Sequence, residues 1–281
     1  MDIRELIENK FRGEYISSRS NPYVTMLAKL DGKKHRDEYG LFLAEGVKLA
    51  GEALDYADCD ALVVSESGAD GSAAGELCSK ALSRSVRLVA MSGSAFSKIS
   101  TERSPQGVIA VVKIPEETVL RTVLDQAEAG KRSGPVIYLD SVQDPGNLGT
   151  ILRSAEAFGA LCVVADGCAD TWNGRTVRAS MGAVFRIPVV RQNCREALAV
   201  MRDKGYDIAG MTLSDRSLEL GKFRISRKTC FVIGNEGHGI SEDIVKECTY
   251  LAKIPMAGKA ESLNAAQACT LVLWEASKEG I

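Results

Sequence analysis

The second half of the chain alternates short apolar runs with segments of helical periodicity. Fully apolar runs of roughly four to eight residues are typical of strands buried on both faces. Strands that alternate with helices predict a mostly parallel sheet with helices on both faces. The expected strands are 136–140, 161–166, 187–190, 207–213, 229–234 and 251–256, and the expected helices are 147–159, 174–185, 195–205, 241–248 and 262–278.

The first half predicts a smaller α/β domain. Short apolar strands at 61–66, 86–91 and 107–113 are separated by helical stretches, and the pattern stops near Pro115. We therefore expect an α/β fold with a small N-terminal domain at 1–114 and a larger domain at 135–281. Between them, residues 115–134 predict a linker helix and a loop.

Composition agrees with two ordinary globular domains. The 281 residues are 45% hydrophobic and 26% charged, which excludes disorder, collagen and coiled coil for the chain as a whole. The net charge of -2 excludes bulk electrostatic attraction to nucleic acid but leaves room for a local basic patch.

The cysteines and the apolar runs indicate a cytoplasmic protein. None of the eight cysteines forms a C-x-x-C pair and there are only two histidines, so we expect buried free thiols and no metal site. Residues 1–12 are charged and lack the apolar core of a signal peptide. No apolar stretch approaches the roughly 20 residues that span a membrane, so we expect no membrane partner.

One basic cluster stands out in the N-terminal half. Lys29, Lys33, Lys34 and Arg36 follow a helix-periodic segment. They form either a solvated helix end or a patch that contacts phosphates.

Three segments carry candidate chemistry, each where a strand ends, which is where open α/β sheets bind ligands. In the first, Asn147 is the expected N-cap of a helix, and Arg153 falls about 140° from Leu148 on the apolar face. Arg153 is then either a solvated residue or a guanidinium presented to an anion.

The second and third segments surround loops that contain glycine. In "IGNEGHGIS", Gly234, Gly237 and Gly239 follow a strand with G-x-x-G-x-G spacing, which is not the dinucleotide fingerprint, and Glu236 either caps the turn or serves a ligand. In the third, "IPM" leads to a helix expected to begin near Ser262. Ser262 either caps that helix or, with Asn264, binds a polar ligand. The helix is apolar nearly all round, which predicts burial on all sides.

Together and in this order, the three segments resemble the signature motifs of the SpoU-type (TrmH-like) RNA ribose 2′-O-methyltransferases of the SPOUT superfamily. The motifs are N-x-G-x-x-x-R from Asn147 to Arg153, then "IGNEGHGIS", then "IPM" followed by "SLN" and Trp274–Glu275. The N-terminal half resembles the ribosomal-protein-like domain that precedes the catalytic domain in one branch of this family.

The resemblance implies S-adenosylmethionine as cofactor, a deep trefoil knot in the C-terminal domain, and a homodimer formed through that domain. It assigns cofactor contacts to Gly234, Gly237, Ile254, Met256 and Leu263.

The resemblance also assigns the activation of the ribose hydroxyl to Arg153, with Asn147, Glu236, Ser262 and Asn264 completing a polar pocket. An arginine pKa above about 12 conflicts with a role as base. We therefore expect Arg153 to orient the 2′-oxygen and stabilise its developing charge, with proton acceptance left open.

The N-terminal domain favours ribosomal over transfer RNA as the substrate, with the basic cluster of Lys29, Lys33, Lys34 and Arg36 as its RNA contact. Four alternatives remain: a transfer RNA ribose methyltransferase, a non-catalytic RNA-binding or ribosome-assembly protein, a base-methylating relative, and a nucleotide-dependent oxidoreductase. The intact motifs disfavour a non-catalytic protein, and the presence of N-x-G-x-x-x-R disfavours a base-methylating relative. The missing dinucleotide fingerprint disfavours an oxidoreductase.

Overall fold

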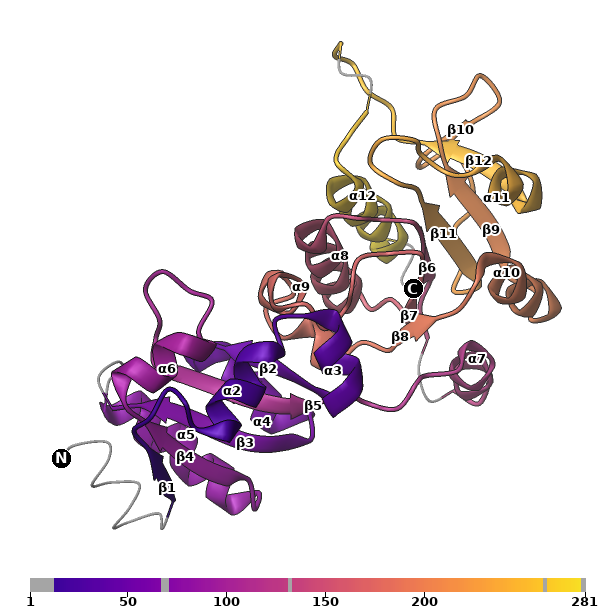
Figure 1. Cartoon of the computed structure of the whole chain (residues 1–281). Coiled ribbons are helices and arrows are strands. Elements are labelled where there is room, and N and C mark those ends of the chain that lie inside the picture. The colour runs from indigo at the N-terminus through magenta and orange to yellow at the C-terminus, as the bar shows by residue number, and fades with distance from the viewer. Residues whose placement is uncertain (1–12, 67–70, 131–132, 260–261, 279–281) are drawn as a thin grey trace. The chain divides into compact units, whose positions relative to one another are not determined.

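A computed structural model describes residues 13–66, 71–130, 133–259 and 262–278 of the chain. Its internal contacts divide the chain into two compact units (Figure 1). The first comprises residues 1–115 together with 172–185, and the second comprises 116–171 together with 186–281.

The first unit is built on a five-stranded sheet in the order β1-β4-β3-β5-β2. Strands β1, β4 and β3 are parallel, whereas β5 runs antiparallel to both β3 and β2. The elements are β1 (Glu14–Ile16), α2 (Pro22–Lys29), α3 (Lys33–Tyr39), β2 (Leu41–Glu45), α4 (Val47–Tyr56), β3 (Cys59–Ser65), α5 (Gly71–Ser83), β4 (Arg87–Met91), α6 (Gly93–Ile99), β5 (Val108–Lys113), α9 (Gly174–Ala179) and the 3-10 helix η2 (Ala183–Phe185).

Helices cover both faces of this sheet. Alternate strand residues such as Val63, Val89 and Val111 pack against α2 and α6, while α4 and α5 contact the opposite face. Because side chains of a strand point alternately to the two faces, both sets are apolar and both are buried.

The segment 172–185 joins this unit rather than the C-terminal one, which the sequence analysis did not foresee. The ring of Trp172 lies 4.8 Å from that of Phe42 on edge strand β2, and Phe185 stacks on the same ring at 6.2 Å. Such long-range aromatic contacts leave no periodic trace in a sequence. The edge of the sheet is thereby covered, which protects its unpaired backbone groups.

Arg36 corrects one expectation about RNA binding. Its side chain is only 3% exposed, and its guanidinium donates hydrogen bonds of 2.6 Å to the carbonyl oxygens of Leu30 and Asp31. Arg36 therefore fixes the turn between α2 and α3 and is not available to a phosphate. Lys29, Lys33 and Lys34 are exposed.

The second unit is built on a seven-stranded sheet in the order β10-β12-β9-β11-β6-β7-β8. All of its strand pairs are parallel. The elements are α7 (Leu120–Glu128), β6 (Val136–Asp140), α8 (Pro145–Ala157), β7 (Cys162–Asp166), β8 (Val189–Arg191), α10 (Cys194–Asp203), β9 (Asp207–Met211), β10 (Leu218–Glu219), β11 (Thr229–Ile233), α11 (Glu242–Glu247), β12 (Tyr250–Lys253) and α12 (Ala265–Lys278).

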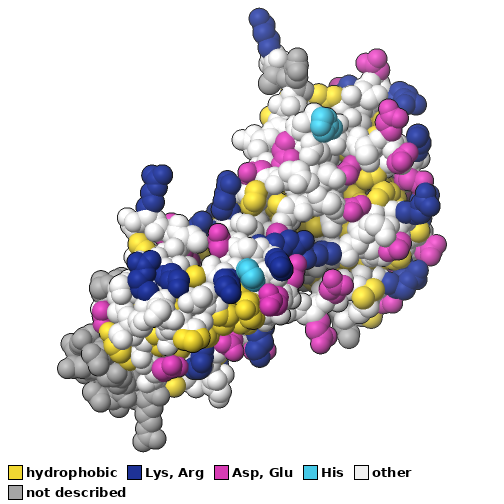
Figure 2. Space-filling view, viewed as in Figure 1, with side chains coloured by type: hydrophobic (Ala, Val, Ile, Leu, Met, Phe, Trp, Pro, Cys, Tyr) yellow, Lys and Arg dark blue, Asp and Glu magenta, His cyan; other side chains and the backbone are white. Residues whose placement is uncertain are grey.

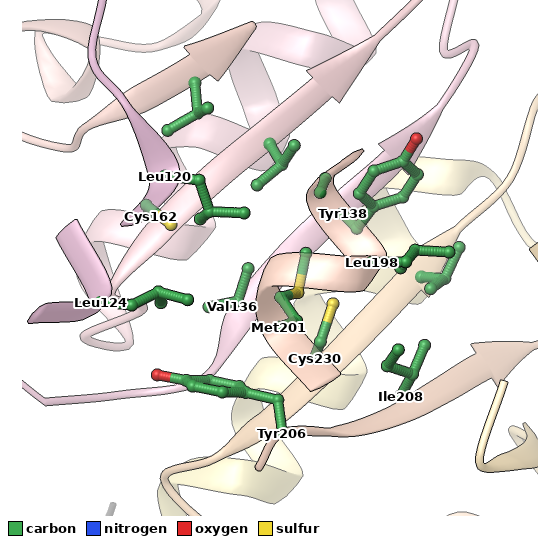
Figure 3. Packing of buried hydrophobic residues seen from close by; sticks show 14 of the residues in the cluster. Leu120, Leu124, Val136, Tyr138, Cys162, Leu198, Met201, Tyr206, Ile208 and Cys230 are labelled. Atoms are coloured by element: carbon green, nitrogen blue, oxygen red, sulfur yellow. The ribbon is translucent and has the colours of Figure 1, made fainter. Parts of the chain in front are cut away.

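The helix expected as a linker belongs to the core of this unit. Leu120 and Leu124 of α7 are fully buried in one hydrophobic cluster with Tyr138, Met201 and Cys230 (Figure 3). A helix with one apolar, buried face packs against a sheet. The charged residues on the other face of α7 led to its interpretation as a linker.

All eight cysteines are free thiols. Burial raises the pKa of Cys59, Cys78 and Cys248 to about 11, so these thiols are protonated and inert at neutral pH. Among the described residues, no helix is long and apolar enough to cross a membrane.

We predict that Arg36→Ala lowers the free energy of unfolding by roughly 1.5–3 kcal/mol, because it removes a buried charged donor to two carbonyl oxygens. Urea unfolding measures this loss. Lys33→Ala, three residues away on the exposed surface, serves as the control and should change stability by less than about 0.5 kcal/mol. Equal stability of both variants would contradict the structural role of Arg36.

Candidate functional site

A cavity of about 290 Å³ lies in the second unit where β9, β11 and β12 end. These three strands are adjacent and parallel, so their carboxyl ends meet at one edge of the sheet. The lining brings together all five residues expected to contact the cofactor, Gly234, Gly237, Ile254, Met256 and Leu263, as well as Glu236 and Ser262.

Gly234 allows the backbone to close around this cavity. A Cβ atom at Gly234 would collide with the main chain of Gly239 and Ile240, so no other residue fits without a shift. Residues 235–239 form a tight loop in which Asn235 and Gly239 exchange hydrogen bonds of 2.9 and 3.0 Å. The G-x-x-G-x-G spacing thus builds a loop that keeps main-chain atoms at the cavity surface.

Glu236 ties this loop to the segment that follows β6. Its carboxylate accepts hydrogen bonds from the amide nitrogens of Gln143 and Asp144, both at 3.3 Å, and from Nδ2 of Asn147 at 2.8 Å. Partial burial alone would raise the pKa of Glu236, but these hydrogen bonds to the charged form prevail, so its pKa lies below the ordinary value.

Asn147 connects all three motifs. It donates through Nδ2 to Glu236, and its Oδ1 accepts a 2.9 Å hydrogen bond from Nδ2 of Asn264. The expectation that Asn147 caps α8 is wrong, because Asp144 is the N-cap and its Oδ1 accepts from the amide of Asn147 at 2.8 Å. The N-cap therefore lies three residues earlier than expected, and Pro145 occupies the first helical position, where its missing N–H would have had no partner within the helix.

Asn264, not Ser262, caps α12. Its Oδ1 accepts hydrogen bonds from the amide nitrogens of Ala266 at 2.9 Å and Gln267 at 3.3 Å, so the helix begins at Ala265. Ser262 lies before the helix and lines the cavity. Both residue types are good N-caps, and the sequence did not distinguish them.

Arg153 lies outside the cavity lining. It is exposed on α8, opposite the buried residues Leu148, Ile151 and Leu152, as the helical wheel predicted. It forms no hydrogen bond or ion pair with other described residues. Its neighbour Ser154 bonds to Oγ1 of Thr270 at 2.7 Å, which places Arg153 beside the contact between α8 and α12.

The expectation that α12 is buried on all sides is wrong for a single chain. Leu271 and Trp274 are 40% and 51% exposed, whereas Cys269, Val272 and Leu273 are fully buried. Leu271 and Trp274 are three positions apart, so they form a short apolar stripe on one face of the helix.

Sequence reasoning missed Thr212 and Leu213, which follow β9 and line the cavity. Their only signal was their place after a strand. A position after a strand identifies a cavity residue only when the strand order is known, because β9 lies between β11 and β12 in the sheet.

Basic side chains gather in the first unit. Lys29 ends α2, and Lys33 and Lys34 begin α3, so three exposed ammonium groups flank one short turn. Figure 2 shows Lys and Arg side chains over the part of the unit formed by α2, α3 and α6.

A parallel sheet with a cavity at the carboxyl ends of adjacent strands defines an α/β protein of the kind that binds its ligand at that edge. The SpoU rRNA Methylase family matches residues 134–274 and an MRM3-like substrate binding domain matches residues 21–110. The chain belongs to the SpoU rRNA methylase family.

Relatives and solved structures agree with this assignment over nearly the whole chain. The 23S rRNA (guanosine(2553)-2'-O)-methyltransferase RlmP of Bacillus subtilis is 33% identical over 262 residues, which cover 92% of this chain and 97% of the relative. The 23S rRNA (uridine(2479)-2'-O)-methyltransferase of Streptomyces viridochromogenes is 30% identical, with 95% and 92% covered. The crystal structure of an AdoMet-bound rRNA methyltransferase from Sinorhizobium meliloti superimposes with a TM-score of 0.84 at 32% identity and covers 96% of this chain and 99% of that one.

We predict that Glu236→Gln destabilises the second unit by about 1 kcal/mol at neutral pH, since an amide nitrogen would face N–H donors. Because the folded-state pKa of Glu236 is lowered, its carboxylate contributes stability above the ordinary pKa. That contribution is lost as the pH falls through the folded-state pKa. Urea unfolding from pH 7 to pH 3 should therefore show that the free energies of unfolding of the unmodified protein and of Glu236→Gln converge. A difference between these free energies that grows on acidification would contradict this role.

Proposed function

We propose that this protein transfers a methyl group from S-adenosylmethionine to the 2′-hydroxyl of a ribose in ribosomal RNA. The observation that carries the proposal is the cavity at the ends of β9, β11 and β12, which collects every residue assigned to the cofactor from the motifs. Family membership and the activities named for both relatives support the same reaction. The match to a substrate binding domain supplies a unit for the RNA.

The cavity suits the cofactor chemically. Ile233, Ile254 and Leu263 offer an apolar wall to a flat heterocycle, and Gly234 leaves main-chain groups open to its polar edge. When bound, S-adenosylmethionine supplies an electrophilic methyl group on a positively charged sulfur. The AdoMet-bound neighbour supports this assignment.

The polar residues of the motifs divide into two roles. Both ends of the Asn147 amide are engaged by Glu236 and Asn264, so Asn147 positions the loops rather than holding Arg153. Arg153 is free of partners among the described residues, and we assign it to the target phosphate and the 2′-oxygen. A guanidinium that remains protonated orients that oxygen and stabilises its developing negative charge.

A homodimer would bring Arg153 to a cavity. Arg153 lies outside the cavity of its own chain, next to an α12 stripe that exposes Leu271 and Trp274. We propose that this stripe is buried against a second copy and that each Arg153 serves the cavity of the partner. An exposed apolar stripe of this kind is typical of an interface.

We propose further that the chain is knotted near its C-terminus. Residues that follow β12 line the cavity together with residues that follow β9 and β11. Further along the same segment, Asn264 donates a hydrogen bond to Asn147 in the first turn of α8. Residues of the loop 235–239 line the same cavity. A trefoil knot requires the chain end to pass through a loop of this kind.

The RNA contact proposed for the first unit is Lys29, Lys33 and Lys34. Exposed ammonium groups bind phosphates without reading sequence, and with a net charge of -2 the attraction must be local. We also propose a cytoplasmic location, which eight free thiols and a ribosomal substrate support.

We predict that the unmodified protein methylates a 23S rRNA transcript, the RNA named for both relatives, and that Arg153→Ala lowers this rate by at least about 100-fold. The variant should keep its fold and its cofactor affinity, measured by calorimetry, because Arg153 is exposed and lies outside the cavity lining. Arg153→Lys separates base from orienting donor, since lysine deprotonates more readily. Rescue by lysine at raised pH would show a base at this position. Near-normal turnover of the alanine variant would remove Arg153 from the site, and methylation only of transfer RNA would redirect the substrate.

Replacing Lys29, Lys33 and Lys34 together by alanine should weaken RNA binding and flatten its salt dependence. Each phosphate contact contributes roughly 0.7–0.9 to the slope of log affinity against log salt, so filter binding between about 50 and 200 mM salt resolves the change. Replacing exposed Lys246 and Lys278 of the second unit provides a control of the same chemistry. A slope equal to that of the unmodified protein would make the cluster a solvated helix end.

A further inference from the structure

The first unit contains a second cavity, of about 200 Å³, along edge strand β2. It is formed by α2, β2, α4, α6 and the segment that carries α9. Its lining is Leu27, Ala28, Leu30, Asp31, Leu43, Glu45, Leu49, Lys98, Ile99, Ser100, Thr101, Trp172, Gly174 and Arg178.

The walls of this cavity suit a flat, largely apolar ring. Leu27, Leu43, Leu49 and Ile99 supply aliphatic surface, and Trp172 supplies an aromatic one. The volume is below the roughly 300–1,000 Å³ of pockets for drug-sized ligands and fits one heterocycle better than a larger molecule.

Most polar groups of the lining are already engaged. Glu45 accepts hydrogen bonds from Ser100 and Thr101, and Arg178 pairs with Glu102. Lys98 donates to the carbonyl of Arg19 at 2.8 Å.

Asp31 differs from these groups. Its carboxylate is exposed and has no partner among the described residues, although its main-chain oxygen accepts from Arg36. A free carboxylate beside an apolar slot accepts hydrogen bonds from the amino group of a base.

The charges around the cavity favour a nucleic acid over an uncharged ligand. Lys29 lies between the lining residues Ala28 and Leu30, and Lys33 and Lys34 follow Asp31 by two and three positions. A base seated in the cavity would therefore have its flanking phosphates beside three exposed ammonium groups. Sequence-specific RNA recognition commonly splays out an unpaired base and stacks it on an aromatic side chain.

We propose that this cavity receives one unpaired base of the RNA substrate, with Trp172 as the stacking surface and Asp31 as the acceptor for its amino edge. The inference rests on the proposed function. It adds a site that recognises a base of the RNA, whereas the lysines bind only its phosphates. It also gives the segment 172–178 a reason to pack with the first unit, since three residues of that segment, Trp172, Gly174 and Arg178, complete the cavity wall.

Filling the cavity tests the proposal. Gly174 lines it, and a Cβ atom there would meet no heavy atom within 4 Å, so Gly174→Leu adds volume without a clash at that atom. We expect affinity for the unmethylated 23S rRNA transcript to fall about tenfold or more, the order of one lost stacked base. The salt slope should stay unchanged, in contrast to the lysine variant. Cofactor affinity should also stay unchanged.

Ser79→Leu is the matched control. It adds the same side chain at an exposed position of α5, on the face of the sheet opposite α2 and α6, and RNA affinity should not change. Asp31→Asn provides a second variant of minimal size, and it should weaken binding of the transcript severalfold by turning part of the acceptor into a donor.

Tryptophan fluorescence reports a base stacked on Trp172 directly, without a measurement of RNA affinity. The chain has two tryptophans, so Trp274→Phe leaves Trp172 as the only reporter. Binding of the transcript should quench Trp172, and Gly174→Leu should abolish the quenching.

The inference fails if folded Gly174→Leu binds the transcript with unchanged affinity and Trp172 is not quenched, while the unmodified protein still methylates it. That result would leave the proposed function intact and make the cavity a packing void. Absence of both binding and methyl transfer in the unmodified protein would overturn the proposed function and this inference together.

Discussion

The site depends on one chain of hydrogen bonds, from Glu236 through Asn147 to Asn264. Glu236 and Asn264 lie in loops after β11 and β12, and Asn147 lies in the first turn of α8 after β6. The two bonded pairs are separated by 89 and 117 positions in the sequence. Glu236 also accepts two main-chain amides, and Asn264 also caps α12, so each end of the chain fixes backbone. Segments held by these hydrogen bonds line the cavity, so the bonds help to fix its shape. The parallel sheet brings the loops to one edge, and this hydrogen-bonded chain sets their final positions.

What could be predicted from the sequence followed from local periodicity and motif spacing. The parallel α/β architecture follows from the alternation of strands and helices. The collection of Gly234, Ile254 and Leu263 at one cavity agrees with the positions that the resemblance to the family motifs assigned to the cofactor. The errors share a different cause. Arg36 looked like part of a basic patch because its acceptors are main-chain oxygens, which have no sequence signature. The cap of α12 was misplaced because Ser262 and Asn264 have similar capping propensity.

Long-range packing could not be predicted in this way. Trp172 contacts Phe42 across 130 positions, and the strand order that makes Leu213 a cavity residue is a property of the assembled sheet. The exposure of residues on α12 could not be predicted from the sequence either. The composition of α12 is that of a fully buried helix, yet a single chain leaves Leu271 and Trp274 in solvent. The apolar composition of a helix therefore does not by itself show which of its faces the fold of one chain buries.

The cavity contains little that could act as a base, and this constrains how the reaction proceeds. Among the described residues of its lining, only Glu236 and Lys253 carry ionisable side chains. Glu236 is a poor base because its pKa is lowered and its oxygens are occupied by structural donors. A carboxylate committed to fixing loops cannot also take a proton without weakening the site. The reaction then depends chiefly on holding an activated methyl group and an oriented oxygen in line, where positioning alone is worth several kcal/mol of barrier. The role proposed for Arg153 suits this division, since a guanidinium would contribute charge and orientation and leave the proton to solvent or to a substrate phosphate.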